Sequence, residues 1–281
     1  MGIKKLIALS FFLLLSQFTV AAPETRVFGM DRNGLFDRGR YYGDRINYYI
    51  NWIGNHDITV NTGGGTSVVS ISSNEVINGF DVWNSRLRNN FHRESNDSQN
   101  HNILVRIVST PSSPSSAGYT SFNSTTTTRN GQTIININSY FFANSAWANF
   151  QNSIRRGFID NDTTFDDYVR VMVRLTIVHE IGHALGLMHP GDTLLASQIV
   201  PRSYLRQLPS IMYPDVTGYF NSLHEHIGRA ITLGDILPSS NDIMGANIML
   251  NGTPQALSRV AYFFAGCLHM ALNSCIKRTE L

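Results

Sequence analysis

The strongest constraint on this 281-residue chain comes from one stretch, residues 179–190, which reads HEIGHALGLMHP. Its first five residues form an H-E-x-x-H pattern. Residues four apart on a helix project from one face, so the imidazoles of His179 and His183 can share one metal ion. Glu180 lies about 100° round the helix from His179. That position suits it to holding a metal-bound water rather than to ligating the metal.

The rest of this stretch predicts a third nitrogen ligand. Gly186 lets the chain leave helical geometry, because glycine tolerates a positive φ at a helix C-terminus. The turn that follows can bring His189 back toward the other two rings, and Pro190 prevents the helix from resuming. Three neutral imidazoles with one open position are typical of a catalytic zinc site, whereas a structural site closes with four protein ligands. A chance match on a buried helix is the alternative, and the added glycine and histidine make it rare.

The extended motif resembles that of the metzincin metalloproteases. Metzincins carry a second mark, a methionine in a tight turn beneath the zinc, and the run 210–214, SIMYP, matches it. The resemblance implies that Met212 supports the metal site without ligating the metal. His189 followed by Pro-Gly-Asp is closer to the serralysins, whereas the Met-Tyr-Pro turn is closer to the matrixins. The chain is therefore identified as a metzincin, matrixin-like with some serralysin-like features.

The order of the expected elements is similar to that of a matrixin catalytic domain. Alternating apolar residues predict a strand over 45–53. A helix follows Ser72, with a capping box formed by Ser72 and Glu75. Residues 54–71, which include three consecutive glycines, are expected to form a flexible loop. Further expected elements are strands over 103–108, 118–122 and 135–138, a helix that begins at 164–167 and runs into His179, and a terminal helix over 241–250.

From the resemblance we expect an α+β fold. It would be a metzincin (zincin-like) catalytic domain over residues 45–252. A twisted mixed sheet and two long helices would lie above the cleft, and a smaller lower lobe would lie below it.

The two ends of the chain flank this domain. Residues 1–22 read as a secretory signal peptide, because two lysines are followed by an apolar run and two alanines. We therefore expect a secreted or extracytoplasmic protein, periplasmic if the source is bacterial. Residues 23–44 are expected to be an N-terminal leader or short pro-segment. Residues 253–281 are expected to form a helical tail packed on the domain, with a partner-binding or membrane-surface role as the alternative. Cys267 and Cys275 lie in this tail. In the oxidising compartment that export implies, the two can form a disulfide or stay as free thiols.

Charge and composition bear on the partners. Without the two lysines of the signal peptide, 20 basic residues balance 20 acidic residues, so we expect neither nucleic acid nor an anionic membrane as partner. Charged residues at the end of the tail argue against a membrane span there. We expect a monomer without an integral span in the mature chain, acting on protein or peptide substrates.

The resemblance implies a secreted zinc-dependent endopeptidase. Zinc lowers the pKa of a bound water to about 7, and Glu180 would act as the general base and then protonate the leaving amine. The substrate would bind extended along an edge strand at about 118–122. The chain from Tyr213 to about His224, including Pro214, would wall the pocket for the residue after the scissile bond. The resemblance also allows calcium, for which the sequence offers no identifiable ligands.

Two other functions stay open. One is a catalytically silent zinc-binding module that recognises proteins, and the other is a zinc amidase on a non-protein substrate. Glu180 disfavours the first, because a pure binder needs no general base. His224 and His226 allow a second metal, although solvated surface histidines are the more common case.

Overall fold

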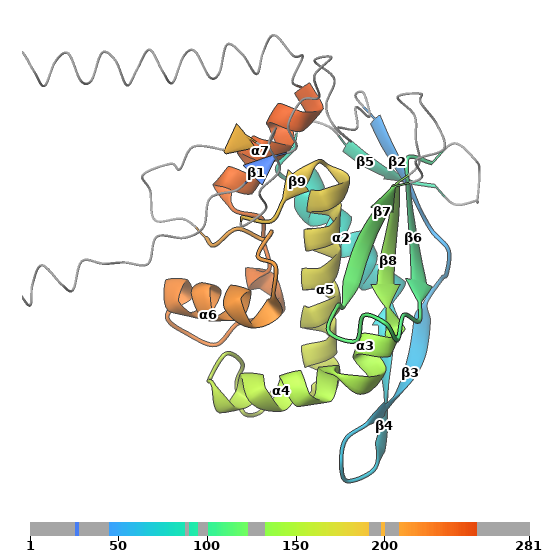
Figure 1. Ribbon diagram of the computed structural model, residues 1–281, viewed down its shortest axis with the longest axis vertical. Helices are drawn as coiled ribbons and strands as arrows, with labels where there is room; N and C mark the ends of the chain where they lie inside the picture. The colour runs from blue at the N-terminus through green and yellow to red at the C-terminus, as the bar shows by residue number, and fades with distance from the viewer. Residues whose placement is uncertain are drawn as a thin grey trace, which may run out of the picture.

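A mixed five-stranded sheet with a long helix packed against it organises the chain (Figure 1). The computed structural model describes residues 26–27, 45–87, 90–94, 101–122, 133–190, 198–199 and 208–251. The strands of this sheet are β2 (Arg45–Ile50), β5 (Asn90–Arg93), β6 (Ile103–Val108), β7 (Gly118–Phe122) and β8 (Thr133–Asn138). Their order is β5-β2-β6-β8-β7, and β7 runs antiparallel to β8 while the other neighbours are parallel. The fold is α+β, as expected, and β7 is an edge strand.

The long helix α5 (Phe165–Ala184) carries two of the three histidines of interest. It begins where the sequence predicts, because the Thr164 side chain accepts a hydrogen bond from the Asp167 backbone N–H at 3.1 Å. From residue 171 to residue 184 it is buried almost all round by the sheet and by α2 (Ser73–Asn84), which lies on the same side of the sheet (Figure 1). A Cβ at Gly79 of α2 would overlap the Ile177 side chain, so glycine there permits the close approach of the two helices.

The start of α2 differs from the predicted capping box. Ser72 does cap the helix, accepting from the Asn74 backbone N–H at 3.2 Å. Glu75 does not reach back to the cap. Its buried carboxylate instead binds Arg174 at 2.7 Å and Arg170 at 3.0 Å, both on α5. Burying a carboxylate without a counter-charge costs more free energy than leaving a helix N-terminus without a second capping bond. The two arginines lie on α5, so only the tertiary structure brings them to Glu75.

Residues 54–71 are not the flexible loop that the glycine content predicted. They contain β3 (Asn55–Asn61) and most of β4 (Thr66–Ser72), an antiparallel hairpin that extends below the sheet in Figure 1. The glycines form only the tight turn, where Gly63 has a φ of 77° and the Thr62 N–H donates to the Gly65 carbonyl. Alternate residues of both strands are buried. This alternation has the period of two that is typical of a strand, and the prediction of a loop from the glycines did not take it into account.

The remaining elements lie beside and beyond the ends of α5. They are α3 (Ser139–Asn144), α4 (Ala146–Arg155), α6 (Val216–Ile227), the 3-10 turn η1 (Leu233–Asp235) and α7 (Ser240–Asn251). The last of these confirms the terminal helix expected over 241–250. A small antiparallel sheet places β1 (Arg26–Val27) between β9 (Leu187–Met188) and β10 (Gln198–Ile199). Two residues of the predicted leader therefore pair with the strand just before His189.

Several predictions fall on other parts of the chain. The signal peptide over 1–22, most of the leader over 23–44 and the tail over 253–281, with Cys267 and Cys275, lie outside the described residues. Within the described ranges, no helix has the length and apolar character that crossing a bilayer requires.

Candidate metal centre

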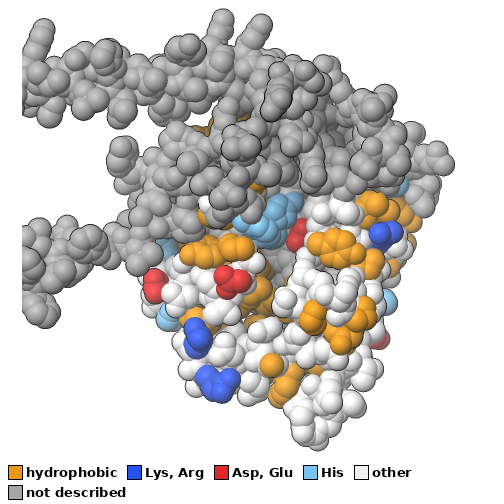
Figure 2. Space-filling model, in the orientation of Figure 1, with side chains coloured by type: hydrophobic (Ala, Val, Ile, Leu, Met, Phe, Trp, Pro, Cys, Tyr) orange, Lys and Arg blue, Asp and Glu red, His pale blue; other side chains and the backbone are white. Residues whose placement is uncertain are grey.

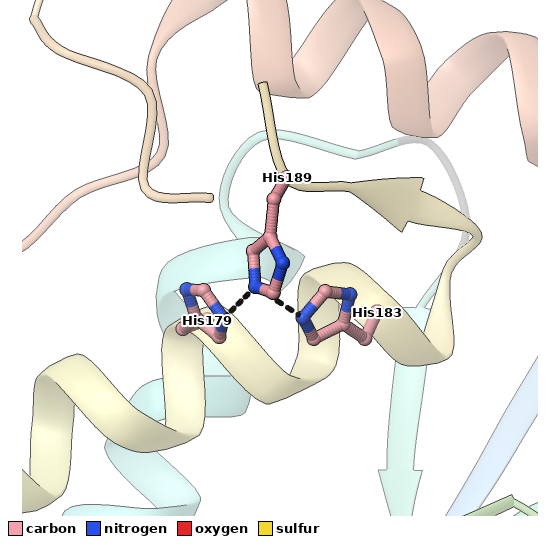
Figure 3. Close-up of side chains that lie close together, drawn as sticks. All are labelled: His179, His183 and His189. Atoms are coloured by element: carbon pink, nitrogen blue, oxygen red, sulfur yellow. Dashed lines mark hydrogen bonds between the residues drawn. The ribbon is translucent and has the colours of Figure 1, made fainter. Parts of the chain in front are cut away.

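Three imidazoles from two neighbouring elements converge on one point (Figure 3). His179 and His183 stand one turn apart on α5, and His189 follows β9. The His189 Nε2 lies 3.1 Å from the His183 Nε2 and 3.3 Å from the His179 Nε2. Two nitrogens bound at 2.0–2.1 Å to a tetrahedral zinc lie roughly 3.3 Å apart. The spacing and the all-imidazole donor set therefore fit one zinc ion.

The turn after α5 brings the third histidine into place. Helical hydrogen bonding ends with the Leu185 and Gly186 N–H groups donating to Ile181 and His183 carbonyls. Gly186 has a φ of 95°, a conformation that glycine adopts without strain. The chain then reverses into β9 and delivers His189, as the sequence predicts.

Backbone carbonyls orient two of the rings. The His179 Nδ1 lies 2.8 Å from the Ile211 carbonyl, and the His183 Nδ1 lies 2.9 Å from the Leu187 carbonyl. A carbonyl can only accept, so each Nδ1 carries the proton and each Nε2 keeps its lone pair for a metal. Burial also lowers the pKa of His179 to about 4, which keeps the ring neutral. These partners could not be predicted from the sequence, because a backbone carbonyl can belong to any residue type.

Glu180 lies next to the triad and is buried. Burial raises the pKa of its carboxyl to about 7, while hydrogen bonds from the side chain and backbone of Thr120 act in the opposite direction. The Thr120 hydroxyl donates to Glu180 Oε2 at 2.7 Å. A carboxyl with a pKa near neutrality can both take and release a proton under ordinary conditions.

The predicted methionine turn packs directly against the histidine helix. Met212 is fully buried, and a Cβ at Gly182 would overlap its Sδ. Asp242 of α7, which is also fully buried, accepts from the Ser210 hydroxyl at 2.7 Å and from the Ile211 N–H at 2.9 Å. The same Ile211 offers its carbonyl to His179. Asp242 thus anchors the turn that orients a histidine, and nothing in its sequence context identified it.

A cavity of about 600 Å³ opens beside the triad. Tyr213 and Pro214 line it, together with His179 and Glu180, but His224 does not. In Figure 2 the histidine surface (pale blue) lies at the end of a hollow between two parts of the molecule. An open cavity next to a general-base candidate gives a substrate chain a route to the site.

His224 and His226 do not form a second metal site in the structure. Both lie in the last turn of α6, and the His224 ring lies 5.8 Å from that of Phe158. Among the described residues, the triad is the one group of three or more side chains placed to hold a metal.

Comparison with known proteins gives three findings. No protein-family model matches the chain. A stretch of 33 residues is 70% identical to "Serralysin" of Proteus mirabilis, covering 12% of this chain and 6% of the serralysin. A chain of the solved structure "GM1 bound form of the ECX AB5 holotoxin" is similar over 80% of this chain and 88% of its own length, with a TM-score of 0.66 and 28% identity.

The structural similarity corrects the predicted fold. The sequence analysis expected a metzincin catalytic domain over 45–252, whereas the similar structure belongs to an AB5 toxin, so the α+β fold is toxin-like. The motifs behind the prediction, residues 179–190 and 210–214, dictate only a helix end and a turn. They do not dictate how the remaining elements pack, and one kind of metal site can be built on different folds. The serralysin match likewise concerns a short stretch and does not extend to the whole architecture.

Proposed function

We propose that the protein is an exported zinc-dependent endopeptidase. The observation that carries this proposal is the placement of Glu180 beside three converging imidazoles, in which the His189 Nε2 lies 3.1 and 3.3 Å from the other two Nε2 atoms, at the mouth of an open cavity. A binding module needs the histidines but has no use for a buried carboxyl next to them. The short serralysin-like stretch supports hydrolysis of peptide bonds.

His179, His183 and His189 would hold the zinc, leaving one position open to solvent and substrate. When bound, zinc supplies the Lewis acidity that activates a water and polarises the scissile carbonyl. The carbonyls of Ile211 and Leu187 keep two of the imidazoles in the tautomer that binds metal.

Glu180 performs the proton transfers. It accepts a proton from the attacking water as the oxygen adds to the peptide carbon, and it delivers that proton to the nitrogen of the leaving amine. The carboxyl returns to its starting state, and the peptide bond is replaced by a carboxylic acid and an amine. A pKa near 7 matches both halves of this task.

The substrate chain binds extended along the edge strand β7, which among the described residues pairs with β8 alone. Its residue after the scissile bond enters the cavity beside Glu180, against Tyr213 and Pro214. The two acidic side chains that line the cavity, Glu180 and Asp215, face no Lys or Arg among the lining residues. We therefore expect an uncharged or basic side chain there rather than an acidic one.

The likeness to an AB5 toxin supports export, in line with the signal peptide expected over 1–22. It also favours a second proposal, that the chain acts as a subunit of a toxin-type assembly rather than as the expected monomer. Size-exclusion chromatography of the protein from its native source would show a larger complex in that case, and a monomer would exclude it.

Proteolysis of a generic substrate tests the function. Zinc-reconstituted protein lacking residues 1–22 is incubated with casein, with and without a zinc chelator, alongside Glu180→Gln. We expect cleavage that the chelator abolishes and that Glu180→Gln lowers by about 10²- to 10⁴-fold, with one zinc bound per chain in both proteins. Full zinc binding without cleavage by the wild type would identify a binding module. Cleavage only of non-peptide amides would identify an amidase.

A further inference from the structure

We propose that Thr120 on the edge strand β7 is a positioning residue that holds the Glu180 carboxyl in its working orientation. This inference rests on the proposed function. The Thr120 hydroxyl lies 2.7 Å from Glu180 Oε2 and 3.0 Å from the Glu180 backbone carbonyl. It has one proton to donate, and the shorter contact assigns that proton to the carboxylate. The other carboxylate oxygen, Oε1, is then left for the attacking water.

Glu180 needs such a restraint because its side chain has three rotatable bonds and reaches out from the helix face next to the histidines. In the described part of the chain, the hydrogen bonds recorded for its carboxyl come from Thr120. A general base must lie within hydrogen-bond reach of the proton it takes, and a displacement of about 1 Å can cost on the order of 10²-fold in rate.

The backbone around Thr120 is fixed in position by its pairing with β8 and by its close packing against α5. Thr120 pairs with Ile135 of β8, whose side chain is fully buried. Two residues earlier, Gly118 brings β7 so close to α5 that a Cβ there would lie 2.5 Å from Thr176 Cγ2 and 3.4 Å from Glu180 Cγ. This close approach sets the distance across which the Thr120 hydroxyl reaches the carboxyl.

The arrangement links two parts of the proposed reaction. β7 is the strand against which an extended substrate would pair, and Thr120 lies in the middle of it. The residue that restrains the base therefore belongs to the element that would bind the substrate backbone. The same strand, β7, would therefore set both the register of the substrate and the orientation of the Glu180 carboxyl.

Two substitutions separate the hydroxyl from the bulk of the side chain. Thr120→Val keeps the shape and removes the donor, and Thr120→Ser keeps the donor. Thr62→Val is the matched control, because it makes the same change at a hydroxyl that donates to the Gly65 carbonyl at 3.1 Å in the hairpin turn, outside β7 and outside the cavity lining. We expect Thr120→Val to lower kcat by about 10- to 100-fold, with KM and zinc affinity within twofold of wild type. Thr120→Ser should stay within about threefold, and Thr62→Val should be unchanged.

A readout independent of activity completes the test. Crystal structures of metal-free wild type and Thr120→Val should show the Glu180 carboxyl in different orientations. Combining Thr120→Val with Glu180→Gln should cost no more kcat than Glu180→Gln alone, because both act on one group.

Wild-type kcat in Thr120→Val, or equal losses in the Val and Ser variants, would overturn the inference and leave the proposed function standing. A zinc-loaded wild type that cleaves no peptide would overturn the proposed function, and the catalytic role of Thr120 with it.

Discussion

At the residue scale, Glu180 combines burial with an ionisable group, and this predicts a stability cost that depends on pH. Its pKa is about 7 in the folded chain against an ordinary value of 4.5. Between these values the unfolded chain has lost the proton that the folded chain keeps, so this group's contribution to stability falls as the pH rises. Glutamine does not titrate. Metal-free Glu180→Gln should therefore match wild type near pH 4.5 and exceed it by up to about 3 kcal/mol above pH 7.

Urea denaturation of both chelated proteins at several pH values measures this difference. His179 is present in both, so its own titration cancels. A difference that stays constant between pH 4.5 and 8 would contradict the predicted shift of the Glu180 pKa.

Gly182 is a second residue whose role can be isolated. Alanine there would push its Cβ into the Met212 Sδ, so the helix and the methionine turn must separate. We expect Gly182→Ala to destabilise the protein by about 1–3 kcal/mol and to weaken zinc binding. Gly65→Ala, in the hairpin turn with open space around it, should change stability by less than about 0.5 kcal/mol. Chemical denaturation and zinc titration of the two variants check this, and equal behaviour would refute it.

At the element scale, one buried carboxylate connects α2 to α5. Glu75 binds Arg174, which is 8% exposed, and Arg170, whose side chain is half exposed. Glu75→Gln leaves the buried Arg174 charge without its counter-ion and should cost about 3–5 kcal/mol. Arg170→Ala removes a solvent-screened pair and should cost less than about 1 kcal/mol. Denaturation midpoints in urea compare the two, and a larger loss for Arg170→Ala would reverse the assignment.

The contact between α7 and the methionine turn predicts an effect at a distance. Asp242→Ala would leave the Ser210 hydroxyl and the Ile211 N–H without their shared acceptor, and the Ile211 carbonyl that orients His179 would shift. We expect zinc affinity to fall by about 10- to 100-fold, measured by competition with a chromophoric chelator. A loss of stability with unchanged zinc affinity would show that Asp242 supports the fold alone.

At the scale of the whole molecule, a bound metal would join α5 to the segment after β9. A ligand that binds only the folded chain stabilises it by mass action, by about 4 kcal/mol at a free concentration 1,000 times Kd. We expect zinc to raise the melting temperature of the metal-free protein, a chelator to reverse the rise, and magnesium, which prefers oxygen ligands, to have no effect. In His189→Ala the zinc response should be sharply reduced, and a response equal to that of wild type would exclude His189 as a ligand.

The whole molecule also shows the limit of reasoning from motifs. The helix start at Thr164, the triad and the terminal helix followed from local spacing, and each lies where it was expected. The prediction of a metzincin-type fold was wrong, because it extended two short motifs to a chain whose fold is similar to an AB5 toxin chain. The prediction missed the hairpin over 55–72 because it relied on the three glycines. It gave too little weight to the alternating apolar residues on either side of them, which the structure shows to be buried.

The sequence by itself determined the geometry of the histidine triad, since His179 and His183 are one helical turn apart and His189 follows a glycine that reverses the chain. Only the tertiary structure decided which groups surround that geometry. Thr120 lies 60 residues from Glu180, Asp242 lies 31 residues from Ile211, and the Nδ1 of His179 meets a carbonyl 32 residues away. Covalent geometry sets positions within a few residues of a helix or turn, whereas partners this far apart meet only when the packed core brings their elements together.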